Sequence, residues 1–362
     1  MDRVGAWVVN GGLIGGHEPR FEIRFCAAEN GVRIAYGTVG SGPLMIVPPA
    51  WISHLELSWH DPAIRAFLTP LAARRTVVLY DKPGCGLSDP WPGRQTIDTN
   101  VQVLQAVADH LQHERFDLLG ISTAAAASLA FAVRHPERVE RLILYGGYAD
   151  GDQVASPQVR AAVLGMVRAH WGLGSDVLAD IFMADAAADT KAHFARLQRG
   201  TATAEFACEL LEQCYETSVE DQLDKVVTPT LVLHRRDDRA IPYRLGRDMA
   251  SRIPGAQLVT LPGRSHFAWA GDSASVVRAI LEYLGENASP PEPHTARSTD
   301  EVLTPRQLQV AALIADGLSN RQIGRRLGIE ERSAEGHVER IRQRLDVRSR
   351  TQIAAWWARR DR

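Results

Sequence analysis

The hydrophobic and polar positions divide the chain into regions of different character. Between about residues 21 and 147, and again between 228 and 263, short apolar runs are separated by turns or by helical patterns such as Thr123 to Arg134. Runs that do not alternate with polar residues are typical of strands buried on both faces of a sheet. We therefore expect a mostly parallel, doubly wound α/β sheet. The expected strands are FEIRFCAA, VRIAYGTVG, LMIVPP, TVVLYD, RFDLLGIS, VERLILYGG, TPTLVLHRRDD and AQLVTLPG.

The stretch from about residue 153 to 224 interrupts this series of strands. It is rich in alanine and in helical patterns, and it contains no good strand. A helical block inserted between two strands of one sheet is typical of a cap above the sheet. The alternative is a set of extra helices packed outside the sheet.

The end of the chain shows only helical patterns. Thr304 followed by Pro305 is a typical helix start, and Gly317 ends this first helix. Ser319 and Ser333 are the expected N-caps of a second and a third helix. A fourth helix is expected over residues 351–360. Two helices joined by a short turn form the geometry that places a helix in the major groove of DNA; the alternative is a plain helical bundle that binds a protein.

These patterns predict two domains joined by a linker. The linker is rich in proline and polar residues and has no hydrophobic period. The expected boundaries are an N-terminal extension over 1–20, a sheet domain over 21–286 with its cap at 153–224, a linker over 287–300, and an all-α domain over 301–362.

Charge is distributed unevenly between these domains. The whole chain has 41 basic and 43 acidic residues, a net charge of −2. Residues 301–362 contain 13 arginines, no lysine and 8 acidic residues, a net charge of +5, so the remainder carries −7. A small basic unit joined to a larger acidic one indicates nucleic acid at the basic end, although a solvated helical face can have the same composition.

The composition mainly excludes some classes of protein and some kinds of site. The chain is 45% hydrophobic and 23% charged, which is ordinary for a soluble globular protein. Its 4 cysteines form no C-x-x-C pair, and the histidines lack ligand spacing, so we expect reduced thiols and no metal site or cofactor. No apolar run reaches the length of a membrane span, and the N-terminus lacks the pattern of a signal peptide. We expect a cytoplasmic protein with no membrane partner.

Three polar residues follow predicted strands and form a candidate catalytic triad. Ser122 lies in GISTA, at the end of a strand and the start of a helix, where its hydroxyl would be exposed; a plain helix N-cap is the alternative. Asp238 follows TLVLHRR, with Asp237 beside it as a second choice, and His266 follows the last strand. Strand ends in an open α/β sheet converge on one crevice. In this arrangement His266 would accept the serine proton and Asp238 would orient the imidazole.

Residues from about 21 to 286 resemble the α/β-hydrolase fold. The resemblance rests on PLMIVPPAWISHLE, VVLYDKPGCGLSDP, LLGISTAAAASLAFAVRHPERV, TPTLVLHRRDDRAIP and LPGRSHF, in that order. It implies that Ser122 is the nucleophile, Asp238 the acid and His266 the base, and that the backbone N–H groups of Trp51 and Thr123 form an oxyanion hole. Two positions depart from the family pattern: Pro49-Ala50 replaces His-Gly, and Ala124 replaces the second elbow glycine. Both changes indicate weaker catalysis, because losing an oxyanion-hole donor costs about 10²–10³ in rate.

The C-terminal segment resembles the LuxR-type helix-turn-helix. The matching stretches are LTPR, GLSNRQI, RLGI, HV and LDVRSR. The resemblance implies binding to double-stranded DNA, with a recognition helix over residues 333–345, by a homodimer on paired half-sites. Ile353, Trp356 and Trp357 of the fourth helix are the expected dimer seam; the alternative is that they pack on the bundle. The candidates for base or backbone contact are Ser333, Glu335, Gly336 and Arg340. The candidates for phosphate contact are Asn320, Arg321, Arg332, Arg344, Arg348 and Arg350.

Three functions remain open at this stage. The first is a transcriptional regulator whose hydrolase-like domain senses a small molecule, with weak hydrolysis as an addition. The second is a serine hydrolase of the esterase or lactonase type that carries a DNA-binding tail. The third is a hydrolase fold kept only as a dimerisation scaffold. The helix-turn-helix favours the first, because an enzyme gains little from binding DNA.

Overall fold

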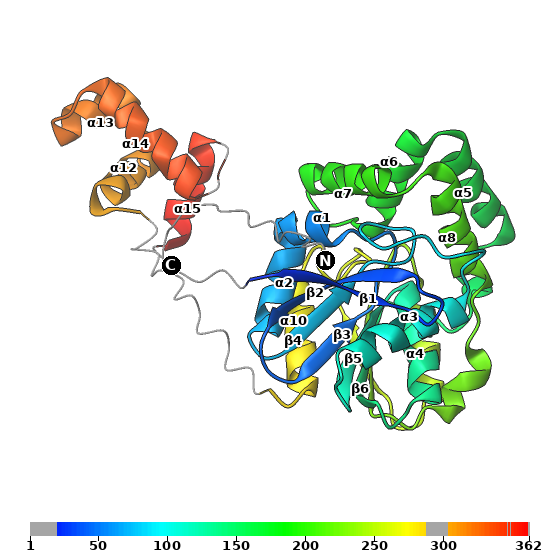
Figure 1. The fold of residues 1–362 in the computed structure, drawn as a ribbon. Coiled ribbons are helices and arrows are strands. Elements are labelled where there is room, and N and C mark those ends of the chain that lie inside the picture. Colours follow the sequence, from blue (N-terminus) through cyan, green and yellow to red (C-terminus); the bar gives the residue numbers. More distant parts are fainter. Residues whose placement is uncertain (1–19, 287–302, 346, 348, 361–362) are drawn as a thin grey trace, which may run out of the picture. The chain divides into compact units, whose positions relative to one another are not determined.

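A computed structural model describes residues 20–286, 303–345, 347 and 349–360 (Figure 1). The described residues form two compact units, which divide the chain near residue 287. The first unit contains an eight-stranded sheet, and the second contains helices only. Among the described residues, no helix is both long enough and apolar enough to cross a membrane.

The sheet of the first unit is mostly parallel, as the apolar runs predict. Its strand order is β1-β2-β4-β3-β5-β6-β7-β8, in which β1 pairs antiparallel with β2, β2 pairs antiparallel with β4, and all later neighbours are parallel. The strands are β1 (Glu22–Ala27), β2 (Arg33–Gly40), β3 (Leu44–Val47), β4 (Thr76–Tyr80), β5 (Phe116–Ile121), β6 (Val139–Tyr145), β7 (Thr230–Arg235) and β8 (Gln257–Leu261).

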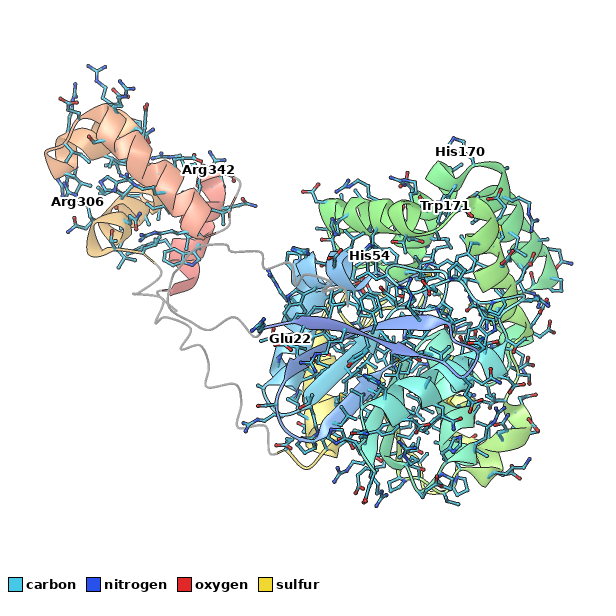
Figure 2. All side chains as sticks on the ribbon, viewed as in Figure 1. Glu22, His54, His170, Trp171, Arg306 and Arg342 are labelled. Carbon is cyan, nitrogen blue, oxygen red and sulfur yellow. The ribbon has the colours of Figure 1, made fainter. Side chains whose placement is uncertain are left out.

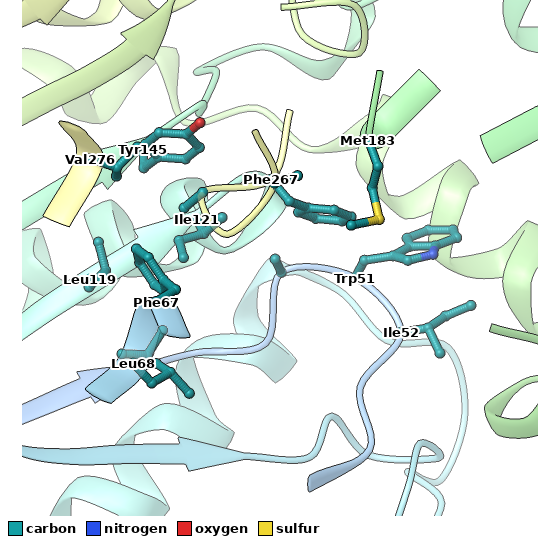
Figure 3. Packing of buried hydrophobic residues seen from close by; sticks show 14 of the residues in the cluster. Trp51, Ile52, Phe67, Leu68, Leu119, Ile121, Tyr145, Met183, Phe267 and Val276 are labelled. Carbon is teal, nitrogen blue, oxygen red and sulfur yellow. The ribbon is translucent and has the colours of Figure 1, made fainter. Parts of the chain in front are cut away.

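Helices bury both faces of this sheet. Successive residues of a strand point to opposite faces, so Leu119 and Ile121 of β5 join one hydrophobic cluster, and Phe116 and Leu118 join another. Figure 3 shows part of the first cluster, from Leu119 and Ile121 to Trp51 and Phe267. The flanking helices are α1 (Leu55–His60), α2 (Pro62–Ala72), α3 (Ile97–His110), α4 (Thr123–Arg134), α9 (Tyr243–Arg252) and α10 (Ser273–Tyr283).

A group of helices between β6 and β7 forms the helical insertion, drawn in green above the sheet in Figure 1. It consists of α5 (Pro157–Ala169), α6 (Trp171–Phe182), α7 (Ala188–Thr201) and α8 (Ala204–Glu216), and 3₁₀ turns at Gly151–Gln153 and Glu220–Lys225 flank it. Buried side chains of the insertion, such as Leu178 and Phe194, belong to the same hydrophobic cluster as Trp51 and Phe267. The insertion therefore packs on the strand ends through a continuous apolar contact.

Arg75, just before β4, forms ion pairs with Asp117 in β5 and with Glu286, the last described residue of the first unit. Arg75 donates from Nε to Asp117 Oδ2 at 2.9 Å and from Nη1 to Glu286 Oε1 at 2.5 Å. The side chains of Arg75 and Asp117 are both only 3% exposed. Burial raises the pKa of Asp117, although the hydrogen bond and the charge of Arg75 act to lower it.

The described residues of the second unit form four helices around a small apolar core. They are α12 (Pro305–Ala315), α13 (Asn320–Leu327), α14 (Glu331–Arg344) and α15 (Arg350–Arg360), and their core includes Val310, Ile314, Ile323, Ile341 and Ile353. The capping boxes of the first two helices fit the sequence pattern. The Thr304 hydroxyl accepts from the Gln307 N–H, and the Ser319 hydroxyl accepts from the Gln322 N–H.

The expected N-cap of the third helix is wrong by one turn. α14 begins at Glu331, and Ser333 lies inside its first turn. The carbonyl of Glu330 accepts hydrogen bonds from the N–H groups of Ser333 and Ala334, so the helical bonds begin before the serine. Gly328, in a left-handed conformation with φ of 66°, ends α13 and allows this early start.

Candidate active site and DNA-binding surface

Ser122 occupies a strained turn between β5 and α4. Its φ is 58° and its ψ is −126°, a conformation that non-glycine residues rarely adopt. The turn is tight because helix and strands approach closely: a Cβ at Gly120 would lie 2.8 Å from Ala125 Cα, and one at Gly147 would lie 2.4 Å from Ala125 Cβ. Small residues around the serine therefore permit the turn that exposes its hydroxyl, as at a nucleophile elbow.

The structure brings the three predicted triad residues together. Ser122 Oγ lies 2.7 Å from His266 Nε2, and His266 Nδ1 lies 2.8 Å from Asp238 Oδ2. Because the carboxylate can only accept, Nδ1 donates to it, which leaves Nε2 free to accept the serine proton. All three side chains are buried. This is the geometry of an activated serine nucleophile.

Asp238 is held in its ionised form. Its Oδ1 accepts the backbone N–H groups of Ala240 and Ile241 at 2.9 and 3.0 Å. Burial alone would raise the pKa of Asp238, but the charge and hydrogen bond of His266, the nearby His234 and the Ile241 N–H outweigh it and lower this pKa. The neighbouring acid Asp237 is exposed. The choice of Asp238 over Asp237 thus agrees with the geometry.

The backbone N–H groups of Trp51 and Thr123 are available to an oxyanion. Both residues line the cavity at Ser122, and among the hydrogen bonds of the described residues neither N–H is a donor. The Thr123 hydroxyl donates to the Ala50 carbonyl and so ties the two segments together. Among described residues other than glycine, only Gln112 and Ser122 have a positive φ, so Ala50 needs no glycine-like conformation. Ala124 is accommodated in a buried position.

Two residues that the sequence reasoning missed support the loop that carries His266. Arg235, at the end of β7, is fully buried and donates to the carbonyls of Ser265 and Asp272 at 3.2 and 3.1 Å. Asp185, in the turn between α6 and α7, accepts the N–H groups of Arg264 and Ser265 through Oδ2 and the Arg264 guanidinium through Oδ1. No sequence motif marks either residue, because their role depends on which loops meet in space.

The helical insertion also contacts the base directly. The carbonyl of Phe182, the last residue of α6, accepts the His266 N–H at 2.7 Å and the Phe267 N–H at 3.3 Å. The Phe182 ring lies 5.9 Å from the His266 ring. The position of α6 and the position of the imidazole are therefore linked through hydrogen bonds rather than through packing alone.

A cavity of about 190 Å³ lies above Ser122. Its floor is formed by Ser122, Thr123, Trp51 and His266, and its upper wall comes from the insertion, including Leu178 and Phe182. Among the described residues, no group of three or more His, Cys, Asp or Glu side chains could hold a metal ion. The Ser122 hydroxyl and the His266 imidazole both line this cavity, so a ligand there can reach the nucleophile and its base.

Most candidate DNA contacts lie on the surface of the second unit. Figure 2 shows the long side chains of these helices, with Arg306 and Arg342 labelled. The exposed candidates are Arg321, Arg332, Ser333, Glu335, Arg340 and Arg344. Gly336 and Asn320 are half-buried, and Arg348 lies outside the described residues.

Two of the candidate phosphate contacts make bonds within the domain. Arg350 donates to Asn320 Oδ1 at 2.7 Å and to the Leu318 carbonyl, so it joins the start of α15 to the start of α13. Arg344 donates to Gln307 Oε1 at 2.7 Å and joins α14 to α12. A guanidinium fixed in this way holds the bundle together and has fewer donors left for a phosphate.

Comparison with known proteins agrees with this geometry. The family model "Alpha/beta hydrolase family" matches residues 44–279, and the chain belongs to this family. The model "Bacterial regulatory proteins, luxR family" matches residues 301–357. The protein is therefore a LuxR-type DNA-binding domain fused to an α/β-hydrolase domain.

Several characterised hydrolases are similar to the first domain. A 2-hydroxy-6-oxononadienedioate/2-hydroxy-6-oxononatrienedioate hydrolase from Cupriavidus pinatubonensis is 29% identical and is matched over 78% of its length and 59% of this chain. A Pseudomonas putida hydrolase of the same name is 30% identical over the same shares of the two chains. An esterase from Exiguobacterium antarcticum has a TM-score of 0.65 at 18% identity, covering 72% of this chain and 98% of its own, and it shows the shared fold alone.

Proposed function

We propose that this protein is a transcriptional regulator whose α/β-hydrolase domain binds and slowly hydrolyses a small ester or lactone. The observation that carries the proposal is the pair of contacts of His266, 2.7 Å from Ser122 and 2.8 Å from Asp238, in a chain that also has a LuxR-type domain. A scaffold has no need for a strained, buried serine with an aligned base, because such strain is destabilising.

The residues support a two-step acyl transfer. Ser122 Oγ attacks the carbonyl carbon while His266 Nε2 takes its proton, and Asp238 stabilises the imidazolium that forms. The backbone N–H groups of Trp51 and Thr123 donate to the oxyanion. His266 then returns the proton to the leaving alkoxide, which leaves an acyl group on Ser122. A water molecule, deprotonated by His266, releases the acid and restores the serine.

The ligand would act on DNA binding by changing the position of the helical insertion. The contacts of Phe182 and Asp185 with the His266 loop connect the cavity wall to the triad, so an occupant that moves α6 also moves the base. The change in DNA affinity can be no larger than the difference in ligand affinity between the two states. Hydrolysis would end the signal by destroying the ligand.

We also propose that the regulator acts as a homodimer on paired half-sites. Trp356 and Trp357 of α15 are only half-buried, with ring centroids 6.4 Å apart, whereas Ile353 is fully buried in the core of the domain. The exposed part of Trp356, and not Ile353, is therefore the surface that we assign to a seam between copies. Light scattering of the full-length protein before and after a Trp356→Glu change tests this; an unchanged dimer would place the seam elsewhere.

The experiment that tests the regulator combines DNA selection with a serine-directed probe. DNA sequences are first selected from a random library with the full-length protein, and their affinity is then measured before and after Ser122 reacts with a fluorophosphonate. The proposal expects a selected, salt-sensitive site whose affinity changes on modification, with no change when Ser122→Ala protein receives the same treatment. If the affinity for the selected site does not change when Ser122 is modified, the hydrolase domain does not control DNA binding, which would contradict the proposal.

A further inference from the structure

The walls of the cavity above Ser122 are almost entirely apolar. Leu178, Leu211 and Phe267 are buried there, and Val163 and Ile181 are half-buried. The Tyr148 hydroxyl, one of the few polar groups in the wall, already donates to the Cys214 carbonyl at 2.9 Å. Apart from the triad and the two N–H groups, the wall offers an occupant little but apolar contact.

Charge is nearly absent from the same wall. Of the described residues that line the cavity, Arg239 alone is a Lys, Arg, Asp or Glu, and it is exposed. Val159, which is 52% exposed, also lines the cavity, so these two residues mark its mouth. A carboxylate inside the cavity would therefore be desolvated without a cationic partner, which is costly.

A second cavity, of about 90 Å³, shares Ala50, Trp51 and Phe267 with the first and offers no cation either. Its wall is apolar apart from serines, a tyrosine and Asp81. The Asp81 carboxylate accepts the N–H groups of Leu55 and Leu87, and it would repel another carboxylate. A ligand that extends past Trp51 into this second cavity would therefore find no cationic partner for an anionic group.

From these walls we infer that the site takes a neutral ester or lactone whose buried part is an apolar group of about six to eight carbons. The size follows from the volume, because a cavity of about 150 Å³ holds a benzene molecule. The inference rests on the proposed function and adds its ligand class. It sets this protein apart from the similar hydrolases whose names specify dienedioates and trienedioates, which are dicarboxylates.

The first test compares two substrates that differ only at the far end of the acyl chain. These are 4-nitrophenyl hexanoate and the 4-nitrophenyl monoester of adipic acid, which carries a terminal carboxylate. We expect kcat/KM to be lower for the anionic ester by at least about 30-fold, because its carboxylate is buried without a partner. Equal rates, or faster hydrolysis of the anionic ester that Arg239→Gln abolishes, would overturn the inference.

The second test measures binding without catalysis. The Ser122→Ala protein is titrated with 2-octanone and with 7-oxooctanoate, and the shift in melting temperature is recorded. We expect stabilisation by the ketone alone. It should be lost in a Val163→Trp variant, which fills the cavity, and kept in the control Leu173→Trp, which changes an exposed residue of α6 outside the cavity wall.

The two tests separate the inference from the function on which it rests. If neither ester is hydrolysed but the ketone still stabilises the protein selectively, the proposed hydrolysis is wrong and the inferred class of ligand is supported. If both esters are hydrolysed at equal rates and the oxo acid binds as well as the ketone, the proposed hydrolysis is supported and the inferred class of ligand is wrong. Stabilisation by the ketone in Val163→Trp would also overturn the inference, because it would place the ligand outside this cavity.

Discussion

The two domains present their functional side chains in opposite ways. In the hydrolase domain, Ser122, Asp238 and His266 are buried and complete one another's hydrogen bonds. In the C-terminal domain, the candidate contacts Arg321 and Arg340 are exposed, and we expect them to hydrogen-bond to DNA. The contacts of a catalytic site can thus be examined within one chain, whereas those of a DNA-binding surface form only when DNA is bound. Substitutions should therefore act through geometry in the first domain and through charge in the second.

The largest effect is expected at Asp238. An Asp238→Asn change keeps the shape but favours the wrong imidazole tautomer, which lowers rates by about 10⁴ in a comparable triad. The rate of fluorophosphonate labelling at Ser122 measures this, with Asp237→Asn as the exposed control. A similar loss in both variants would contradict the assignment of the acid.

The same residue predicts how stability depends on pH. The folded pKa of Asp238 is lowered, so its contribution to stability is present above the unfolded pKa of about 3.9 and is lost as the pH falls through the folded value. The free energy of unfolding of the Asp238→Asn protein should therefore fall less than that of the wild type as the pH falls through this range. Urea unfolding of both proteins between neutral and acidic pH checks the difference.

The next largest effect concerns the stability of the hydrolase domain. An Arg75→Met change leaves Asp117 buried without its main partner, which typically costs about 3–5 kcal/mol. The free energy of unfolding from urea denaturation measures the loss. Arg74→Met, at the exposed neighbouring position, is the control and should change it little. A double change of Arg75→Met with Asp117→Leu should recover much of the loss, because it also removes the buried Asp117 carboxylate.

A smaller effect is expected at Asp185, which positions the loop of the base. Asp185→Ala removes the acceptor for the N–H groups of Arg264 and Ser265, and we expect labelling of Ser122 to slow by about tenfold, since small misplacements of catalytic groups are costly. Asp185→Asn keeps an acceptor and should recover part of the rate. Asp180→Ala, at an exposed position of α6, the helix before this turn, is the control. Equal slowing in Asp180→Ala would indicate a general effect of the insertion.

The smallest effects should distinguish outward from inward arginines in the DNA-binding domain. Arg321→Ala should reduce the slope of log affinity against log salt by about one and leave stability unchanged, as for a phosphate contact. Arg350→Ala should lower the melting temperature of the domain instead, because it breaks the bonds to Asn320 and Leu318. The reverse pattern would contradict the assignment of roles.

Much of the fold could be predicted from the sequence, because the central strands β3, β5 and β7 are buried on both faces and therefore form continuous apolar runs. The proximity of Ser122, Asp238 and His266 could also be predicted, since each residue follows a strand. The start of α14 could not, because the backbone bonds of Glu330 competed with the capping preference of Ser333. The roles of Arg235 and Asp185 could not be predicted either, since they depend on contacts between distant loops.

The most direct test of the account is labelling of Ser122 by a fluorophosphonate in the full-length protein, followed by mass spectrometry. We predict one adduct, on Ser122, that forms in the wild type, is absent in Ser122→Ala and forms far more slowly in His266→Ala. Folded wild-type protein that remains unlabelled, or labelling that is equally fast without His266, would contradict the claim that this regulator retains a working serine nucleophile.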